Sequence, residues 1–96
     1  MIVATWNDVV IARSDNTKIV ENNHYFPRED VETGFLTETD HQTTCPWKGE
    51  ANYFDIEVNG KKNKNGAWTY KEPKEKAAEI KNHIAFWHGV TVEEEK

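Results

Sequence analysis

The sequence predicts a mainly β protein with about seven antiparallel strands and two short helices. Its clearest strand is residues 51–58, where apolar and polar side chains alternate, so Phe54 and Ile56 should share one buried face. Two dipeptides are typical of tight hairpins: Asn7-Asp8 separates two runs of β-forming residues, and Asn59-Gly60 follows the strand at 51–58. We therefore expect the strand at 51–58 to be central.

The first half of the chain divides at short polar or proline-containing breaks. Pro27 followed by acidic residues is typical of the start of a short helix, and Gly34 is a natural end to it. Phe35 and Leu36 should pack beneath this helix. The predicted elements are strands at 2–6, 9–12 and 17–21, a helix at 27–34, a loop at 37–41 and a strand at 42–45.

The second half is predicted from turn signals and from one charged, alanine-containing run. Asn59-Gly60 and Asn65-Gly66 both indicate turns, so residues 61–64 should form a hairpin tip. Pro73 begins a segment rich in helix-forming residues. The further elements are a strand at 67–70, a helix from 73 to about 82, closing strands at 84–88 and 90–93, and a frayed acidic tail at 93–96.

Composition limits the classes of function. The 96 residues suffice for one domain, residues 1–96, with a single modest core. A net charge of −5 argues against nucleic acid as a partner, because proteins that bind phosphate backbones present a basic face. No apolar run suggests a membrane partner, and the N-terminus lacks a secretory signal pattern. The single cysteine favours a reducing compartment, and hence a cytoplasmic location.

The central corner, residues 45–49, combines a thiol, a proline, a lysine and a glycine. Pro46 should end the preceding strand and start a turn that brings Cys45 close to Lys48, while Gly49 is free to take a positive φ. A thiol beside an ammonium group favours thiolate. The alternative is that Cys45 is a small buried hydrophobe and Lys48 a solvated surface charge.

The polar residues give little support for other chemistry. Four histidines are candidates for metal ligands, but none has the spacing of a ligand pair. They are His24, His41, His83 and His88. Ser14 lies in a polar turn with no histidine near it, so it is not expected to be a nucleophile. We therefore expect neither a metal site nor a cofactor.

Three ordered stretches resemble one known family. The first is Tyr-Phe-Pro-Arg-Glu-Asp-Val at 25–31, and the second is Cys-Pro-Trp-Lys-Gly at 45–49 with Ala51 and Tyr53. The third comprises Ala67, Trp68, Tyr70 and Pro73, with Ala85 and Phe86 further on. On these residues the chain resembles the domain-of-unknown-function 427 family over nearly its whole length. Trp47 stands where that family usually has a smaller aromatic residue, and Asn82 where glycine is common.

The resemblance implies a β-tent fold, in which two small antiparallel sheets meet at an angle. Methionine-R-sulfoxide reductases and the thalidomide-binding domain of cereblon share that fold. Many such relatives hold zinc through two Cys-x-x-Cys pairs, whereas this chain has one cysteine, so we expect a zinc-free domain. An older label for the family suggests nucleotidyl transfer, but the sequence has no glycine-rich phosphate loop.

Our preferred hypothesis is a small-molecule binding module. Large rings at chain corners favour a concave aromatic site between the sheets, and fold relatives with aromatic cages support this by analogy. The expected ligand-binding residues are Tyr25, Trp47, Trp68 and Tyr70, with Lys48 or Asp30 orienting the ligand. The null hypothesis for Trp68 is that it simply belongs to the core.

Two other functions stay open. The protein could be a thiol-dependent enzyme, with Cys45 as the catalytic nucleophile and Lys48 stabilising its thiolate. It could also be a scaffold for protein partners, in which the aromatic residues only stabilise a small core. Asp30 is equally open: it could stabilise a helix dipole, or pair with Lys48 or Arg28.

Overall fold

A computed structural model describes residues 1–95 of the chain. Its strands are β1 (Ile2–Trp6), β2 (Val9–Ser14), β3 (Lys18–Val20), β4 (Asn23–Tyr25), β5 (Leu36–Cys45), β6 (Gly49–Val58), β7 (Lys61–Thr69), β8 (Ile84–Phe86) and β9 (Thr91–Glu94). Three 3₁₀ segments complete the described part: η1 (Arg28–Asp30), η2 (Thr33–Phe35) and η3 (Glu75–Ile80). The predicted mainly β class is confirmed.

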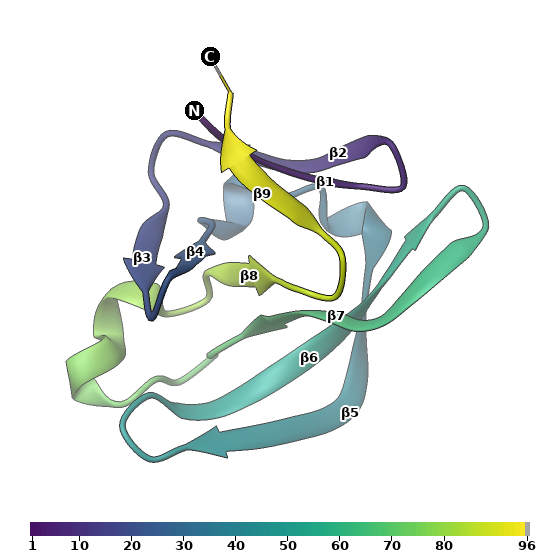
Figure 1. The fold of residues 1–96 in the computed structure, drawn as a ribbon. Helices are drawn as coiled ribbons and strands as arrows, with labels where there is room; N and C mark the ends of the chain where they lie inside the picture. Colours follow the sequence, from purple (N-terminus) through teal and green to yellow (C-terminus); the bar gives the residue numbers. More distant parts are fainter. Residues whose placement is uncertain (96) are drawn as a thin grey trace.

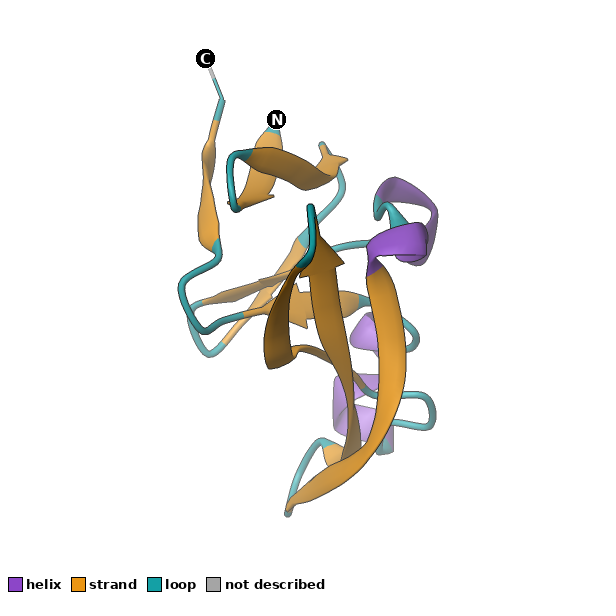
Figure 2. Ribbon diagram, turned by 90° about the vertical axis from the view of Figure 1, so that its right-hand side faces the viewer, coloured by secondary structure: helices purple, strands orange, loops and turns teal. Residues whose placement is uncertain are grey.

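The strands form two larger antiparallel sheets and one two-stranded ribbon. Strand order is β2-β1-β9 in the smaller of the two and β5-β6-β7-β8 in the larger, while β3 pairs only with β4. The three-stranded sheet lies above one face of the four-stranded sheet at an angle to it (Figures 1 and 2). The β3–β4 ribbon and η3 lie together at one side of the larger sheet (Figure 1).

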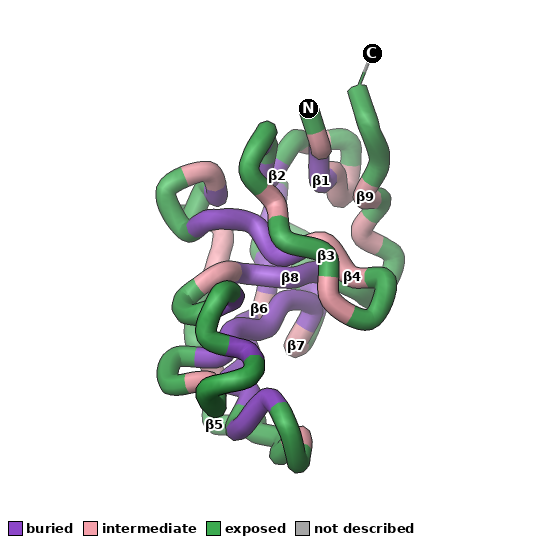
Figure 3. Tube along the Cα trace, turned by 90° about the vertical axis from the view of Figure 1, so that its left-hand side faces the viewer, coloured by how far each residue is buried: buried purple, intermediate pink, exposed green. Residues whose placement is uncertain are grey.

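Strand β6 is the central element, as predicted. It pairs with β5 on one side and β7 on the other, and Phe54 and Ile56 are buried. Figure 3 shows that burial is continuous along β8 and extends over β6 and β7, whereas β3 is largely exposed. The part of the larger sheet formed by β6, β7 and β8 is therefore covered on both faces, whereas the side chains of the edge strand β5 are largely exposed.

Alternation along the strands of the larger sheet divides the interior into two hydrophobic clusters. The first joins this sheet to the β1-β2-β9 sheet and contains Phe54, Ile56, Ala67, Ile84 and Phe86. The partly buried Phe35 and Leu36 pack against this cluster, whereas the sequence had suggested that they pack beneath a helix. The second lies on the opposite face, beneath the β3–β4 ribbon and η3. It contains Tyr25, Ala51, Tyr53, Trp68, Tyr70, Ala77, Ile80 and Ala85. Successive residues of a strand point to opposite faces, so each of β6, β7 and β8 contributes side chains to both clusters.

Tight turns join most neighbouring strands. The predicted hairpins at Asn7-Asp8 and Asn59-Gly60 are present, with both residues of each turn at positive φ. A third turn of this kind, at Glu21-Asn22, joins β3 to β4 and was not predicted. The sequence gives a weak signal there because glutamate is an unusual residue for a positive φ.

The predicted helices are 3₁₀ turns instead. Pro27 does precede a helical turn, η1, but this turn ends at Asp30, and Gly34 lies inside η2 rather than after a helix. In η3 the backbone of Ala77 leaves helical geometry at φ −116°, which divides the segment into two short turns. Short 3₁₀ segments are common connectors between strands, where there is no room for a longer helix.

Two segments predicted as loop or turn belong to strands. Residues 37–41 are part of β5, and residues 61–64 are part of β7. The Asn65-Gly66 signal marks an irregularity inside β7, where the pairing with β6 shifts between Phe54 and Ile56. Asn65 has a φ of 53°, and its backbone N–H donates to Asp55 Oδ1 at 2.8 Å. Asn65 and Gly66 therefore form a β-bulge, which interrupts the pairing of β7 with β6 without ending the strand.

The end of the chain is more ordered than the expected frayed tail at 93–96. Glu93 and Glu94 belong to β9 and pair with Val3 and Ile2 of β1, and Glu95 N–H donates to Met1 O at 2.8 Å. Residue 96 lies outside the described residues. No helix within residues 1–95 has the length and apolar character needed to cross a membrane.

Candidate functional site

Four of the six predicted ligand-binding residues meet on one face of the larger sheet. Trp68 lies near the end of β7 and Tyr70 just beyond it, Tyr25 ends β4, and Lys48 lies in the corner between β5 and β6. All four are buried: Tyr25 is 0% exposed, Tyr70 5%, Lys48 7% and Trp68 8%. We call this group, together with Glu21, the lysine site.

The aromatic rings of the lysine site pack against one another. The Tyr25 ring lies 6.1 Å from Trp68 in an edge-on arrangement and 6.4 Å from Tyr70. Trp68 Nε1 donates a hydrogen bond to the Tyr25 hydroxyl at 3.2 Å, so the polar atoms of both rings are satisfied within the cluster. This burial favours the hypothesis that Trp68 is a core residue over the hypothesis that it forms the wall of an open cleft.

Lys48 is a buried charge, not the solvated surface lysine of the alternative hypothesis. Its ammonium group donates to Glu21 Oε1, whose side chain is 55% exposed at the β3–β4 turn. It also lies 5.6 Å from the centre of the Tyr70 ring and 5.5 Å from that of Trp47. The ammonium is thus held by one surface carboxylate and two ring faces.

The electrostatics of the site favour protonated side chains. Burial disfavours the charged form of Lys48, but the hydrogen bond to Glu21 and the adjacent tyrosines outweigh it, so the pKa of Lys48 is raised. Burial also raises the pKa of Tyr25, against the opposing hydrogen bond from Trp68. The pKa of Tyr70 is raised for the same reason, although the charge of Lys48 opposes the shift. At neutral pH the Lys48 ammonium, paired with Glu21, is therefore charged, and the phenols of Tyr25 and Tyr70 are neutral.

The corner that carries Lys48 is fixed by backbone contacts. Gly49 has a φ of +110°, as expected from a turn that returns the chain into β6. Lys48 O accepts the backbone N–H of Lys74 at 2.9 Å, and Lys74 Nζ donates to Pro46 O at 2.6 Å. These contacts tie the corner to the segment before η3, which holds Lys48 against the aromatic cluster.

Cys45 and Trp47 lie at the margin of the lysine site. Cys45 is a free, half-buried thiol that packs against the second hydrophobic cluster. The Trp47 side chain is 38% exposed, with one contact to the Lys48 ammonium. Trp47 is therefore the predicted site residue at this corner with the most solvent-exposed side chain.

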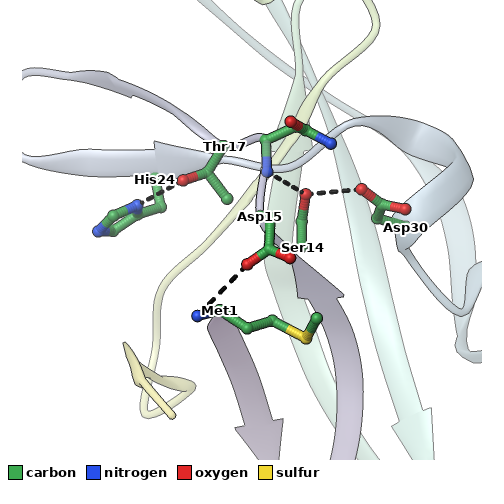
Figure 4. Close-up of polar contacts among 7 residues, drawn as sticks. Met1, Ser14, Asp15, Thr17, His24 and Asp30 are labelled. Carbon is green, nitrogen blue, oxygen red and sulfur yellow. Dashed lines mark hydrogen bonds and ion pairs between the residues drawn. The ribbon is translucent and has the colours of Figure 1, made fainter. Parts of the chain in front are cut away.

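Asp30 belongs to a different part of the molecule. Its Oδ2 accepts a 2.6 Å hydrogen bond from the hydroxyl of Ser14, which is itself buried at the end of β2 (Figure 4). The same Ser14 oxygen accepts the backbone N–H of Asn16 at 2.9 Å. The Asp30 carboxylate thus fastens η1 to β2, and it pairs with neither Lys48 nor Arg28, the two partners considered from the sequence.

Sequence reasoning missed two contributors to this face of the sheet. Glu21 is separated from Lys48 by 27 residues, and no pattern links an acidic turn residue to that lysine. Trp87 extends the row of rings, at 5.3 Å from Trp68 and 6.0 Å from Tyr53, with its side chain 41% exposed. Its position two residues after Ala85, in a strand predicted to run to residue 88, could have placed it on this face.

The histidines do not gather around a common point. Among residues 1–95, no three side chains of His, Cys, Asp or Glu lie close enough together to hold a metal ion. His24 and His83 each bond to a nearby group, Thr17 Oγ1 and Lys81 O respectively. His41 lies against the Tyr53 ring at 4.6 Å. The His88 ring lies 4.1 Å from the Trp87 ring, so each histidine has a local structural contact.

Comparison with known proteins gives one family match. Residues 1–96 match a family model described as "Domain of unknown function (DUF427)". A search of curated proteins finds no match to the chain.

Proposed function

Because the chain belongs to the DUF427 family over its whole length, and that family has no assigned activity, we propose a function from the lysine site itself. The protein is a small-molecule binding module, and its ligand is a small carboxylate with a flat apolar body. The carboxylate of the ligand takes the place of Glu21 on the Lys48 ammonium, and the body of the ligand lies against Trp47 and Tyr70.

The observation that supports this proposal best is the ion pair of Lys48. Among the described residues, its buried ammonium pairs with one carboxylate, that of Glu21, and Glu21 lies on an exposed turn. A buried ammonium group needs a paired anion, because leaving it unpaired costs several kcal/mol. Lys48 obtains that anion from Glu21, which lies on a two-residue turn of a two-stranded ribbon and is more than half exposed. A carboxylate arriving from solvent forms the same charge-assisted bond, so exchange with Glu21 preserves the pairing of Lys48.

The surrounding rings support an aromatic or otherwise flat ligand. Trp47 is exposed, and the Lys48 ammonium lies at similar distances from the centres of the Trp47 and Tyr70 rings. A flat apolar body bound at Lys48 would bury part of the exposed Trp47 surface, and this burial contributes about 25 cal/mol per Å².

We also propose that the protein has no nucleic-acid partner, because its net charge is −5, and that it is cytoplasmic, because it has a single cysteine.

The test uses benzoate as the probe, with benzamide as a neutral compound of the same shape. Tryptophan fluorescence and amide chemical shifts measure binding to the wild type and to Glu21→Gln and Lys48→Met. Glu21→Gln removes the internal competitor while keeping a hydrogen-bond acceptor, so benzoate should bind about tenfold more tightly. Lys48→Met should abolish benzoate binding, and benzamide should bind all three proteins weakly.

Glu93→Gln is the matched control, because it removes the same charge from an exposed position on β9. It should leave benzoate binding at the wild-type level. If Glu21→Gln has no more effect than Glu93→Gln, or if Lys48→Met binds benzoate as the wild type does, the carboxylate proposal fails. Failure of all flat compounds to bind would favour the scaffold function instead.

The same Lys48→Met variant tests the thiol-enzyme alternative. Cys45 is half-buried against the cluster, so we expect iodoacetamide to react with it more slowly in the folded protein than in urea. Rapid alkylation of the folded protein that Lys48→Met slows would instead favour Cys45 as a nucleophile.

A further inference from the structure

A second candidate site lies away from the lysine site, in a hollow of about 430 Å³ between three chain segments. The segments are residues 15–18 between β2 and β3, residues 27–29 at the start of η1, and residues 81–83 between η3 and β8. They are far apart in the sequence, so the hollow exists only in the folded protein. Its size is that of a small-molecule site.

Each of the three segments contributes one cation to the hollow. These cations are Lys18, Arg28 and Lys81, and none of them forms an ion pair with any of the described residues. Two carboxylates, Asp15 and Glu29, also line the hollow, and Asp15 is paired with the N-terminal ammonium of Met1 at 3.4 Å. Three cations therefore face two carboxylates, of which one already has a cationic partner. In a chain of net charge −5, this convergence leaves a local excess of positive charge.

Hydrogen bonds fix the walls of the hollow. Ser14, at the end of β2, binds both Asp30 of η1 and the backbone of Asn16, and Thr17 Oγ1 bonds to His24 Nδ1 at 2.9 Å (Figure 4). On the third wall, His83 O accepts the hydroxyl of Thr69 at 2.7 Å. The walls therefore hold their spacing before any ligand arrives, which lowers the entropic cost of binding.

Neutral hydrogen-bonding groups lie among the cations. Asn16, Thr17, Asn82 and His83 line the same hollow. The side-chain amides of Asn16 and Asn82 can donate to anionic oxygens, and they supply direction that exposed ammonium groups alone do not. The lining thus matches a ligand with several anionic oxygens better than it matches an apolar one.

We infer that this hollow binds a small polyanion, either a phosphate ester or a polycarboxylate, between Lys18, Arg28 and Lys81. This site is independent of the lysine site, because its cations and walls are separate from Lys48 and Glu21. One anionic group spans two of the walls, and a second reaches the third. Both classes of ligand carry two or more negatively charged groups close together, and this is the property that the hollow recognises.

Amide chemical shifts provide the test, in titrations with pyrophosphate and with citrate at constant ionic strength. We expect shifts at residues 16–18 and 82–83. Lys18→Gln and Lys81→Gln should each weaken binding about fivefold, and the double variant roughly twentyfold, because each removes one partly exposed ion pair to the ligand. Lys61→Gln, an exposed lysine on the β6–β7 hairpin, is the matched control and should have no effect.

Preference for one probe identifies the source: pyrophosphate alone indicates a phosphate ester, and citrate alone a polycarboxylate. Two results overturn the inference. The first is the absence of shifts in these segments with both probes at millimolar concentration. The second is that Lys61→Gln weakens anion binding as much as Lys18→Gln and Lys81→Gln do, which would mean that the anions are attracted to the whole surface and not bound in the hollow. Neither result bears on benzoate binding at Lys48.

Discussion

Lys48 combines two properties that rarely occur together, near-complete burial and a permanent positive charge at neutral pH. The ammonium keeps its charge because burial, which lowers its pKa, is opposed by the hydrogen bond to Glu21, which raises it. Tyr25 and Tyr70 stay neutral beside it, with their pKa values raised by burial. All three groups therefore hold their protons more tightly in the folded protein than in the unfolded chain.

This linkage predicts alkaline instability. In the unfolded chain tyrosine releases its proton near pH 10 and lysine near pH 10.4, while the folded protein retains these protons to higher pH. The stabilisation is therefore fully present below about pH 10 and is lost as pH rises through the folded pKa values, by up to about 1.4 kcal/mol per pH unit and group. Urea unfolding between pH 7 and pH 11 measures it.

Tyr70→Phe is the internal control for that measurement, because it removes one titrating group and keeps the ring. The decline above pH 10 should become shallower in this variant. An unfolding free energy that stays constant to pH 11 in the wild type would contradict the prediction.

At the residue scale, the sequence predicted the corner well and its partners poorly. Proline and glycine fix backbone geometry locally, so the turn around Lys48 and the positive φ of Gly49 follow from the residues themselves. The pairing of Lys48 with Glu21, and of Asp30 with Ser14, depends on how distant segments pack. No local pattern encodes such contacts.

Among the elements, the bulge in β7 shows how a turn signal acts inside a strand. Asn65 takes a positive φ, as it would in a hairpin turn, but Asp55 captures its N–H and Trp87 Nε1 donates to its carbonyl at 2.6 Å. The chain therefore stays in the sheet. Strand β5 was missed at 37–41 for another reason: it is an edge strand with largely exposed side chains, so it shows no hydrophobic alternation.

The bulge predicts a specific sensitivity at Gly66. A Cβ there would lie 2.7 Å from the side chain of Asn63, which is buried and donates to His88 O at 2.9 Å. Gly66→Ala should therefore lower the free energy of unfolding by about 1–3 kcal/mol through overpacking. Thermal or urea unfolding measures the change.

Gly34→Ala is the comparison, since nothing lies within 4 Å of the added Cβ and its φ is not positive. This variant should stay within about 0.5 kcal/mol of the wild type. Similar values for the two alanine variants would show that Asn63 moves aside at no cost and that the bulge is not tightly packed.

For the whole molecule, one sheet separates two interiors. Hydrophobic alternation was enough to predict the mainly β class and the central place of 51–58, because those depend on strand periodicity. It was not enough to predict the β3–β4 ribbon as a separate sheet, because three-residue strands carry little periodic signal. That ribbon carries Glu21 and covers part of the lysine site.

This architecture predicts uneven resistance to hydrogen exchange. Amides of β6 and β7 should exchange slowest, since both strands have a neighbour on each side and the sheet is covered on both faces. Amides of β3 should exchange fastest among the strands, because β3 pairs only with β4 and is largely exposed. Exchange measured by NMR at neutral pH reports both. Equal protection of β3 and β6 would mean that the ribbon opens only with the whole fold, which would oppose local displacement of Glu21.

Because the two hydrophobic clusters lie on opposite faces of one sheet, they can evolve separately. Neighbouring residues of β8 point into different interiors: Ile84 and Phe86 into the one that joins the sheets, and Ala85 into the one beside Lys48. A lineage that replaces residues on the Lys48 side leaves the packing between the two sheets intact. Under the proposed binding function, changes of ligand preference would fall on one cluster, while the packing between the two sheets depends on the other. The two sets of contacts alternate along the same three strands, so a substitution can alter one set without altering the other.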